Sequence, residues 1–466
     1  MATIADGCRL MEEGCQALAV IEEAGMRIDM DRLDWTISET SQQIEQMMAE
    51  QKKDDVWRLW RRRFGEKASM GSRSQLAKIL FSLEKDGGLG FEHRGHTRLG
   101  KQARMDEDVL EQIDHPFVKQ FLKLEGLKKL RSTYLMGVRR EVVDGLLHPS
   151  FNLHLVRTYR SSSDHPNFQN IPIRDKEIGK LIRSCFVPRP GHVLVESDYG
   201  SLEVRVSACY NHDPMLIEYI NDPTKDMHRD MAAECYMIEP HEVSKEARFY
   251  AKNQFVFPEF YGSYFAQCAP NLWNAIGRYN LKTTDGQSLE DVLLAQGITS
   301  LGETFSHYSG RIETKPGTFM EHIRQVEEDF WGRRFKVYAK WKLDWFREYQ
   351  RTGGFSMLTG FRVDGVYKRN DVINYPVQGS AFHCLLWSLI QLVKWLRRNR
   401  MKTVVVGQIH DSIVADVHED ELQDYLAMTR QIMLKDIRRE WPWIIVPLEV
   451  EQEVAETNWF EKKKVA

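Results

Sequence analysis

Two aspartates at the ends of predicted β-strands are the residues of this sequence best suited to chemistry. Asp198 ends the apolar stretch GHVLVESD, and Asp411 lies in VVVGQIHDSIVADV, between two apolar stretches that predict a β-hairpin. An ionised carboxylate removed from water is costly unless it is paired or binds a metal. Alone, each residue has a simpler interpretation, because aspartate also caps helices and forms turns. Together, two carboxylates on strands of one sheet can hold two Mg²⁺ ions about 4 Å apart, which suits phosphoryl transfer.

A predicted helix between the two aspartates carries cations followed by aromatic rings. In KEARFYAKNQFVFPEFYGSYF (245–265), Arg248 and Lys252 are four residues apart and therefore share one helix face. Phe257 and Tyr261 follow them. Such a helix could bind a triphosphate and stack on a base. A solvent-exposed basic stripe beside core aromatics would give the same pattern, so this stretch alone does not decide.

Two further stretches are rich in hydrogen-bond donors. YRSSSDHPNFQNIPIR (159–174) offers amide and guanidinium groups, which suit contacts to sugar, phosphate and minor-groove acceptors. In VINYPVQGSAFH (372–383), Asn374 and Gln378 flank Pro376. A surface loop explains each stretch equally well when it is considered alone.

Composition restricts the class of protein. The 466 residues include 64 Lys and Arg against 67 Asp and Glu, so any nucleic-acid binding must rest on local basic surfaces. The seven cysteines contain no CxxC pair, which indicates a reduced, zinc-free protein. No signal peptide opens the chain, and its longest apolar stretch, residues 381–396, is too short to cross a bilayer. A cytoplasmic location without membrane contact is therefore expected.

Strands and helices alternate irregularly along the chain, which predicts the α+β class. Helical spacing dominates the first ~145 residues. The strands that end near Asp198 and Asp411 are the elements that must position the carboxylates. FSMLTGFRVDGVYKR (355–369) predicts a hairpin. The stretch from about 268 to 330 contains what reads as an insertion.

Taken in order, these stretches resemble the motifs of the DNA polymerase I family (family A). SDYGSLEVRV is similar to motif A, RFYAKNQFVFPEFYG to motif B and QIHDSIV to motif C. RSSSDHPNFQNIPIR and INYPVQGSA resemble two further family stretches. IEEAGMRIDMDRL, SRSQLAKILF and DHPFVKQFLKLEGLKKLRSTY resemble the thumb region, so that the resemblance covers nearly the whole chain. The residues of KNQFVFPEFYG and INYPVQGSAFH resemble the corresponding stretches of phage replicases more than those of bacterial repair enzymes.

The resemblance implies a right-hand polymerase fold, with an antiparallel-sheet palm and helical thumb and fingers. The expected boundaries are a thumb at 30–146, a palm at 147–205 and 374–466, and fingers at 206–373 with an insertion at about 268–330. Nothing in the sequence resembles the family's proofreading exonuclease or 5′ nuclease. The resemblance therefore implies a polymerase without its own exonuclease.

The resemblance also implies roles for individual residues. Asp198 and Asp411 would bind two Mg²⁺ ions, with the Tyr199 carbonyl as a further ligand. Lys252 would protonate the leaving pyrophosphate, and Glu203 would exclude a 2′-hydroxyl. The expected nucleotide-binding residues are Arg248, Lys252, His228, Phe257, Tyr261, Glu203 and Arg174. The expected DNA-binding residues are Arg160, Asn374, Gln378, His410, Asn167 and Gln169.

Two positions depart from the family's pattern. Motif C has Ser412 where the family usually has glutamate, which leaves the third, accessory carboxylate without an assigned residue. Motif B has one extra residue between Lys252 and Tyr261, so the alignment of Lys252 requires a local helix bulge.

The implied function is template-directed extension of a DNA primer with deoxynucleoside triphosphates, in phage DNA replication. Primer-template DNA is the implied partner, and a separate exonuclease or other replisome proteins are further ones. A single-subunit RNA polymerase would share both aspartates, the motif-B lysine and Tyr-Gly, but Glu203 and residues 160–172 argue against it. A non-catalytic DNA-binding replisome component is the other alternative, against which the complete set of aspartates and cations argues.

Overall fold

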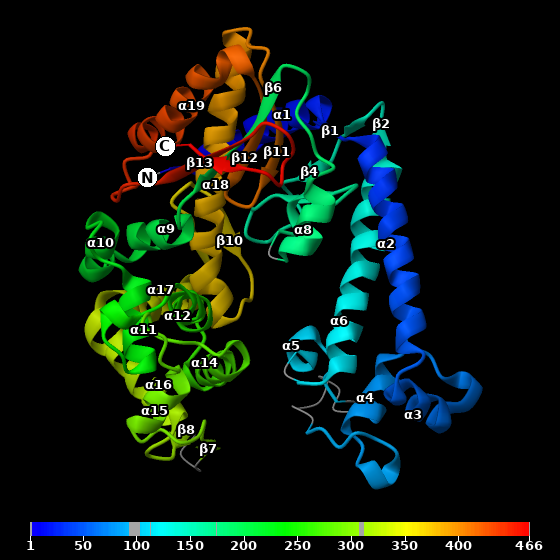
Figure 1. Cartoon of the computed structure of the whole chain (residues 1–466). Helices are drawn as coiled ribbons and strands as arrows, with labels where there is room; N and C mark the ends of the chain where they lie inside the picture. The colour runs from blue at the N-terminus through cyan, green and yellow to red at the C-terminus, as the bar shows by residue number, and fades with distance from the viewer. Residues whose placement is uncertain (1, 93–102, 112, 174, 307–311, 466) are drawn as a thin grey trace.

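The chain folds into a central β-sheet with two separate groups of helices extending from it (Figure 1). The computed structural model describes residues 2–92, 103–111, 113–173, 175–306 and 312–465. Hydrophobic side chains form three clusters, one under the sheet, one in the helices of residues 202–352 and one at the tip of the helices of residues 30–141. We call these parts the palm, the fingers and the thumb. The α+β class predicted from the sequence is confirmed.

The palm sheet has five strands in the order β11-β12-β6-β13-β14, and every neighbouring pair is antiparallel. Its strands are β6 (His192–Tyr199), β11 (Val404–Ile409), β12 (Ser412–His418), β13 (Val450–Ala455) and β14 (Lys463–Lys464). The central strand, β6, pairs Asp198 with Ser412 of β12 on one side and with Glu451 of β13 on the other. The register therefore fixes what lies beside Asp198.

One face of the sheet is covered by α18 (Arg369–Arg398), against which α1 (Ile4–Ala24) packs. Alternate residues of a strand point to opposite faces, so Val193, Val195 and Tyr199 face these helices and are buried. The other palm elements are β4 (Ser150–Asn152), β5 (Ser162–Asp164), η4 (Phe168–Asn170), α8 (Lys176–Arg183), η8 (Glu419–Glu421), α19 (Leu422–Gln431), the π-helix η9 (Ile432–Asp436) and α20 (Ile437–Glu440).

The thumb is a long helix pair with a small helical tip (Figure 1). The pair is α2 (Met30–Gln51) and α6 (Pro116–Lys129), and Asp29 caps α2 by accepting from the backbone of Arg32. The pair is extended by η3 (Leu130–Leu135) and α7 (Met136–Glu141). The tip contains α3 (Asp55–Phe64), η1 (Gly65–Lys67), α4 (Arg73–Phe81), η2 (Glu84–Asp86) and α5 (Glu107–Leu110), and its base contains β1 (Met26–Arg27), β2 (Val142–Val143) and β3 (Leu146–Leu147).

The fingers are helical and carry the predicted hairpin at their end. β9 (Gly354–Ser356) pairs antiparallel with β10 (Arg362–Asp364), as the sequence predicts. The helices are α9 (Leu202–Asn211), α10 (Pro214–Asn221), α11 (Met227–Tyr236), η5 (Pro240–Glu242), α12 (Lys245–Ala251), η6 (Lys252–Val256), α13 (Phe257–Phe260), α14 (Phe265–Tyr279), α15 (Leu289–Ala295), α16 (Phe319–Asp329), η7 (Phe330–Arg334) and α17 (Lys336–Thr352). A small hairpin, β7 (Thr304–Ser306) with β8 (Ile312–Thr314), lies between α15 and α16.

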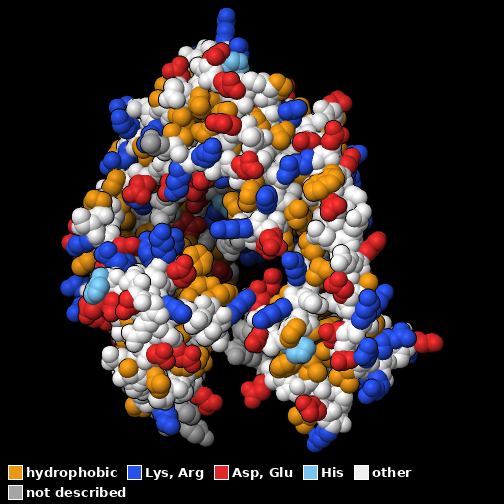
Figure 2. All heavy atoms as spheres, viewed as in Figure 1, with side chains coloured by type: hydrophobic (Ala, Val, Ile, Leu, Met, Phe, Trp, Pro, Cys, Tyr) orange, Lys and Arg blue, Asp and Glu red, His pale blue; other side chains and the backbone are white. Residues whose placement is uncertain are grey.

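Thumb and fingers face each other across a hollow below the palm, which Figure 2 shows with acidic and basic side chains around it. They also touch, because Arg278 of α14 forms an ion pair with Glu111, next to α5, at 2.6 Å. Within the described part of the chain, no helix combines the length and the apolar character that a bilayer crossing requires.

Candidate active site

Asp198 and Asp411 meet at one end of the palm sheet. Ile409 pairs with Ser412, so His410 and Asp411 form a two-residue turn between β11 and β12. His410 has a φ of 48°, in the left-handed region that such tight hairpin turns require. The backbone N–H of Tyr199 donates to the carbonyl of Asp411 at 3.1 Å. This bond joins the two aspartate-bearing segments and brings their carboxylates to the same edge.

Burial disfavours the charged form of both carboxylates. Burial raises the pKa of Asp411 to about 6, despite a favourable contribution from Arg160. Burial, and next the charge of Asp411, raises the pKa of Asp198 to about 7, although one side of Asp198 is open to solvent. Oδ1 of Asp411 is buried and has no hydrogen-bond partner among the described residues. Arg160 and Lys462 offset only part of this cost, so a divalent cation would be a favourable partner for the pair.

These residues fit a divalent cation that takes most of its ligands from elsewhere. The described residues contain no cluster of three or more His, Cys, Asp or Glu that could form a complete protein cage. Mg²⁺ favours one or two carboxylates together with water and substrate phosphates. The Tyr199 side chain is directed into the palm, where its hydroxyl contacts Ser388 and the carbonyl of Met433, each at 2.9 Å. Only its backbone carbonyl remains for the predicted ligand role.

Glu203 lies at the centre of a second group of predicted residues. Arg160 donates to Oε1 of Glu203 at 2.9 Å, and the Tyr261 hydroxyl donates to Oε2 at 2.5 Å. Asn374 donates to the backbone carbonyl of Tyr261 at 2.8 Å. These four residues come from four separate segments of the chain. Three of them, Glu203, Tyr261 and Asn374, border a pocket whose other lining residues are Val204, Ser207, Phe257, Phe260, Tyr338 and Val377.

The helix bulge that the alignment of motif B requires is present. Residues Lys252–Val256 form a π-helical turn (η6) between α12 and α13. Pro258 follows this turn, and proline lacks a backbone N–H and clashes with the carbonyl four residues earlier in a regular helix. The Lys252 ammonium then lies over the Phe257 ring at 5.0 Å, and the rings of Phe257 and Tyr261 are 6.2 Å apart. The π-helical turn thus accommodates the extra residue before Phe257 and Tyr261.

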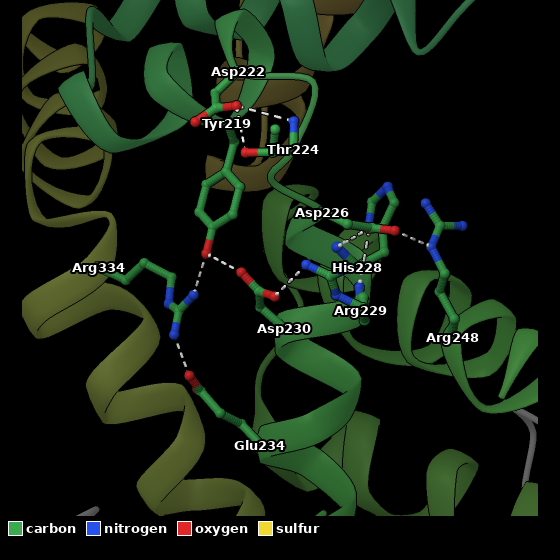
Figure 3. A network of polar contacts seen from close by, with 10 residues as sticks. All are labelled: Tyr219, Asp222, Thr224, Asp226, His228, Arg229, Asp230, Glu234, Arg248 and Arg334. Carbon is green, nitrogen blue, oxygen red and sulfur yellow. Dashed lines mark hydrogen bonds and ion pairs between the residues drawn. The ribbon is translucent and has the colours of Figure 1, made fainter. Parts of the chain in front are cut away.

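One cation of the fingers, Arg248, is oriented by a carboxylate that the sequence analysis did not identify (Figure 3). Asp226 caps α11 by accepting from the backbone of His228 and Arg229, and its Oδ2 accepts from Nε of Arg248 at 2.7 Å. Its position two residues before the histidine in DMHRD was the available signal, because aspartate is a preferred helix N-cap. Asp226 therefore links Arg248 to the start of α11.

His228 completes this group as a buried, neutral ring. Its ring lies 5.6 Å from that of Phe257, and its Nδ1 has no hydrogen-bond partner in the described part of the chain. Burial, and then the positive charges of Lys252 and Arg248, lower the pKa of His228 to about 4. Burial and Arg248 also lower the pKa of Lys252. Because Lys252 and Arg248 disfavour each other's positive charge, an anion bound between them would be stabilised.

The polar loop of residues 159–173 supports the turn of His410 and Asp411 through Gln408, which is buried. Gln169 and Ser161 both donate to Oε1 of Gln408 at 2.7 Å, and Gln408 donates to the carbonyl of His410 at 2.7 Å. Gln408 and Ser161 were not among the predicted site residues. Gln169 was predicted to bind DNA, and its amide nitrogen is directed to Ser161 and Gln408 in this structure.

The remaining predicted residues differ in their exposure and position. Asn167 and His410 are exposed, and Gln378 is half-buried on α18. Arg174, predicted to bind nucleotide, lies outside the described residues.

Comparison with known proteins places these features in one family. The profile of DNA polymerase family A matches residues 36–275 and 363–461. The chain is 30% identical over 455 residues to DNA polymerase I of Lactococcus lactis subsp. cremoris, covering 96% of this chain and 45% of that protein. It is 28% identical over 463 residues to DNA polymerase I of Chloroflexus aurantiacus, covering 97% and 43%. The chain thus spans less than half the length of these curated relatives.

A solved structure has the same architecture. The POL domain of Pol1 from M. smegmatis, in complex with DNA primer-template and dNTP, aligns with a TM-score of 0.75 and 24% sequence identity. The alignment covers 97% of this chain and 70% of that one. This likeness confirms the α+β right-hand fold predicted from the sequence.

Proposed function

The chain belongs to DNA polymerase family A, and we propose that it extends the 3′ end of a DNA primer with deoxynucleoside triphosphates. The observation that carries this proposal is the meeting of Asp198 and Asp411 at one sheet edge, with a buried carboxylate oxygen left without a partner. Arg160 lies between this end of the sheet and the proposed nucleotide pocket. Its positive charge favours the ionised form of Asp411, and its guanidinium donates to Glu203. Primer-template DNA and deoxynucleotides are the proposed partners.

The proposed cofactor is a pair of Mg²⁺ ions held by Asp198, Asp411 and the Tyr199 carbonyl. When bound, such ions supply Lewis-acid activation of the primer hydroxyl and neutralise charge on the phosphates. Arg248, Lys252 and His228 would bind the triphosphate, with Asp226 keeping Arg248 in position. Lys252, with its lowered pKa, would give its proton to the leaving pyrophosphate.

We propose the thumb at 30–146, the fingers at 206–373 with the insertion at about 268–330, and the palm in the remainder from 147 onward. We further propose a role in phage DNA replication and no exonuclease activity in these 466 residues. Support for the phage role is the resemblance of KNQFVFPEFYG and INYPVQGSAFH to phage replicases. Shortening of a mispaired primer by the pure protein would contradict the proposed lack of exonuclease activity.

Primer extension with Mg²⁺ on a primed DNA template tests the proposed function. Parallel reactions receive deoxynucleotides or ribonucleotides, and a gel-shift assay measures primer-template binding. Extension with deoxynucleotides alone is expected. Extension with ribonucleotides would support an RNA polymerase instead. Binding without any extension would support a non-catalytic DNA-binding protein.

Glu203→Ala is expected to raise ribonucleotide incorporation relative to deoxynucleotides by about ten-fold or more. Glu203 is held against Tyr261 and Arg160 at the wall of the pocket, so its carboxylate occupies fixed space that an alanine would vacate. A pocket discriminates against an extra hydroxyl only where a fixed group obstructs or fails to pair with it. The measurement is kcat/KM for each nucleotide. Glu203→Gln keeps the bulk and is the matched control; an unchanged ratio in Glu203→Ala would remove the assigned role.

Gln408→Ala is expected to lower kcat for extension about ten-fold or more. The buried amide holds the His410 carbonyl, and a small displacement of a reacting group costs up to about a hundred-fold in rate. Gln452→Ala is the control, because Gln452 is also buried in the palm sheet but contacts Ser197 and the Leu426 carbonyl, away from the turn. Both variants should lose stability, and equal losses of kcat in both would refute the positioning role.

A further inference from the structure

Glu196 places a third carboxylate beside the aspartate pair. It precedes Asp198 by two residues on β6, and residues two apart in a strand lie on the same face of the sheet. Its charge is among those that raise the pKa of Asp198. The Ser412 hydroxyl, on the neighbouring strand, donates to Oε1 of Glu196 at 3.3 Å. Position 412 therefore contributes a donor to a carboxylate that β6 supplies.

Lys462, near the end of the chain, neutralises this carboxylate. Its ammonium lies 2.6 Å from Oε2 of Glu196 and 2.7 Å from Oε2 of Glu453, and its side chain is only 11% exposed. The indole N–H of Trp459 donates to the same Oε2 of Glu196 at 2.9 Å. Glu196 is thus a largely buried carboxylate, paired through both oxygens, next to a residue of the proposed metal site.

The segment that carries Lys462 is built into the palm. Trp459 is fully buried, stacks on Phe168 at 5.3 Å, and has the guanidinium of Arg183 above its ring at 3.9 Å. β14 then pairs with β13 and extends the palm sheet. These contacts hold Lys462 in place, so its charge acts from a fixed point.

A buried ion pair is weak support for stability, because its desolvation offsets most of the Coulomb gain. What distinguishes this pair is its place beside Asp198. A negative charge on Glu196 attracts a cation bound at Asp198 and a positive charge on Lys462 repels it, so the two charges oppose each other there. Both act on the charge of Asp198, in opposite directions.

We infer that Glu196 and Lys462 are positioning residues that set the strength with which Asp198 binds a divalent cation. The C-terminal segment, residues 458–464, is on this view part of the active site. The inference rests on the proposed function only for the identity of the metal site. The inference assigns the accessory carboxylate of this chain to Glu196. At the motif C position where the family usually has that carboxylate, this chain has Ser412.

The test is Mn²⁺ binding to the full, DNA-free chain, measured by electron paramagnetic resonance of free Mn²⁺. Lys462→Met is expected to lower the Kd about three- to ten-fold, and Glu196→Gln to raise it by a similar factor. The double variant removes both charges, and its Kd should lie within about two-fold of wild type. The Mg²⁺ concentration that gives half-maximal extension should move in the same directions.

Two controls keep the result specific. Lys119→Met removes an exposed partner of Asp114 in the thumb, where screening is strong, and should change the Kd by less than about two-fold. Asp198→Asn should abolish the site. Unchanged Kd values in both single variants, weaker binding in both, or no site that depends on Asp198 would overturn the inference. Mn²⁺ binding with the expected shifts but no extension by the wild type would overturn the proposed function alone.

Discussion

Asp411→Ala should reduce primer extension by about a thousand-fold or more while leaving primer-template binding close to wild type. If Asp411 is one of two metal-binding carboxylates, as proposed, its removal forfeits several kcal/mol of transition-state stabilisation, and each 1.36 kcal/mol is about ten-fold in rate. DNA binding should persist because it depends mostly on phosphate contacts away from Asp411. Single-turnover extension and a gel-shift titration, run on the same preparation, measure the two quantities. Extension at the wild-type rate would refute the metal assignment.

Asp411→Asn separates charge from shape and adds a stability prediction. An aspartate whose folded pKa is raised to about 6 destabilises the fold once it ionises, so the asparagine variant should be the more stable protein at neutral pH. The gain should be roughly 1–3 kcal/mol without metal, complete above pH 6 and absent well below pH 4. Thermal unfolding in EDTA across this range measures it. A variant that is inactive yet more stable would indicate a carboxylate retained for function at a cost in stability.

The sequence was sufficient wherever a prediction depended on local spacing. The apolar runs around residues 410 and 411 predict a hairpin, and a hairpin turn fixes which residues it exposes. One surplus residue before Tyr261 predicts a bulge, because a helix has no other way to keep Lys252 in register with it. Both are confirmed. In each case the information lies within about ten residues of chain.

Contacts between distant segments could not be predicted in the same way. Gln408 bonds to Gln169, which lies 239 positions earlier, and Lys462 pairs with Glu196 across 266 positions. A lone glutamine in a strand or a lysine near a terminus carries no periodicity or spacing that signals such a contact. The pairing of β11 with β12 decides what lies beside Gln408, and the pairing of β6 with β13 decides what lies beside Glu196; register emerges only when the sheet is assembled. The roles assigned to individual site residues remain predictions.

Lys252→Ala is expected to lower the single-turnover rate of extension by about a hundred-fold or more and to weaken nucleotide binding. Two effects would combine, since the proposed roles of the ammonium are to bind phosphate and to supply a proton to the leaving pyrophosphate. General acid catalysis alone contributes about 10²–10⁴-fold. The lowered pKa of Lys252, caused first by burial and then by Arg248, brings it closer to working pH and makes it a better acid.

Lys252→Arg divides these two effects. Arginine keeps the positive charge but does not lose its proton at any working pH. Nucleotide binding should therefore recover in this variant, whereas the rate should stay well below wild type. The pH profile gives a second criterion, because the wild-type rate should fall as pH rises through the pKa of Lys252, and the arginine variant should lack that fall. A wild-type rate in Lys252→Arg would restrict Lys252 to binding phosphate, and a normal rate in Lys252→Ala would show that η6 aligns a different residue with the triphosphate.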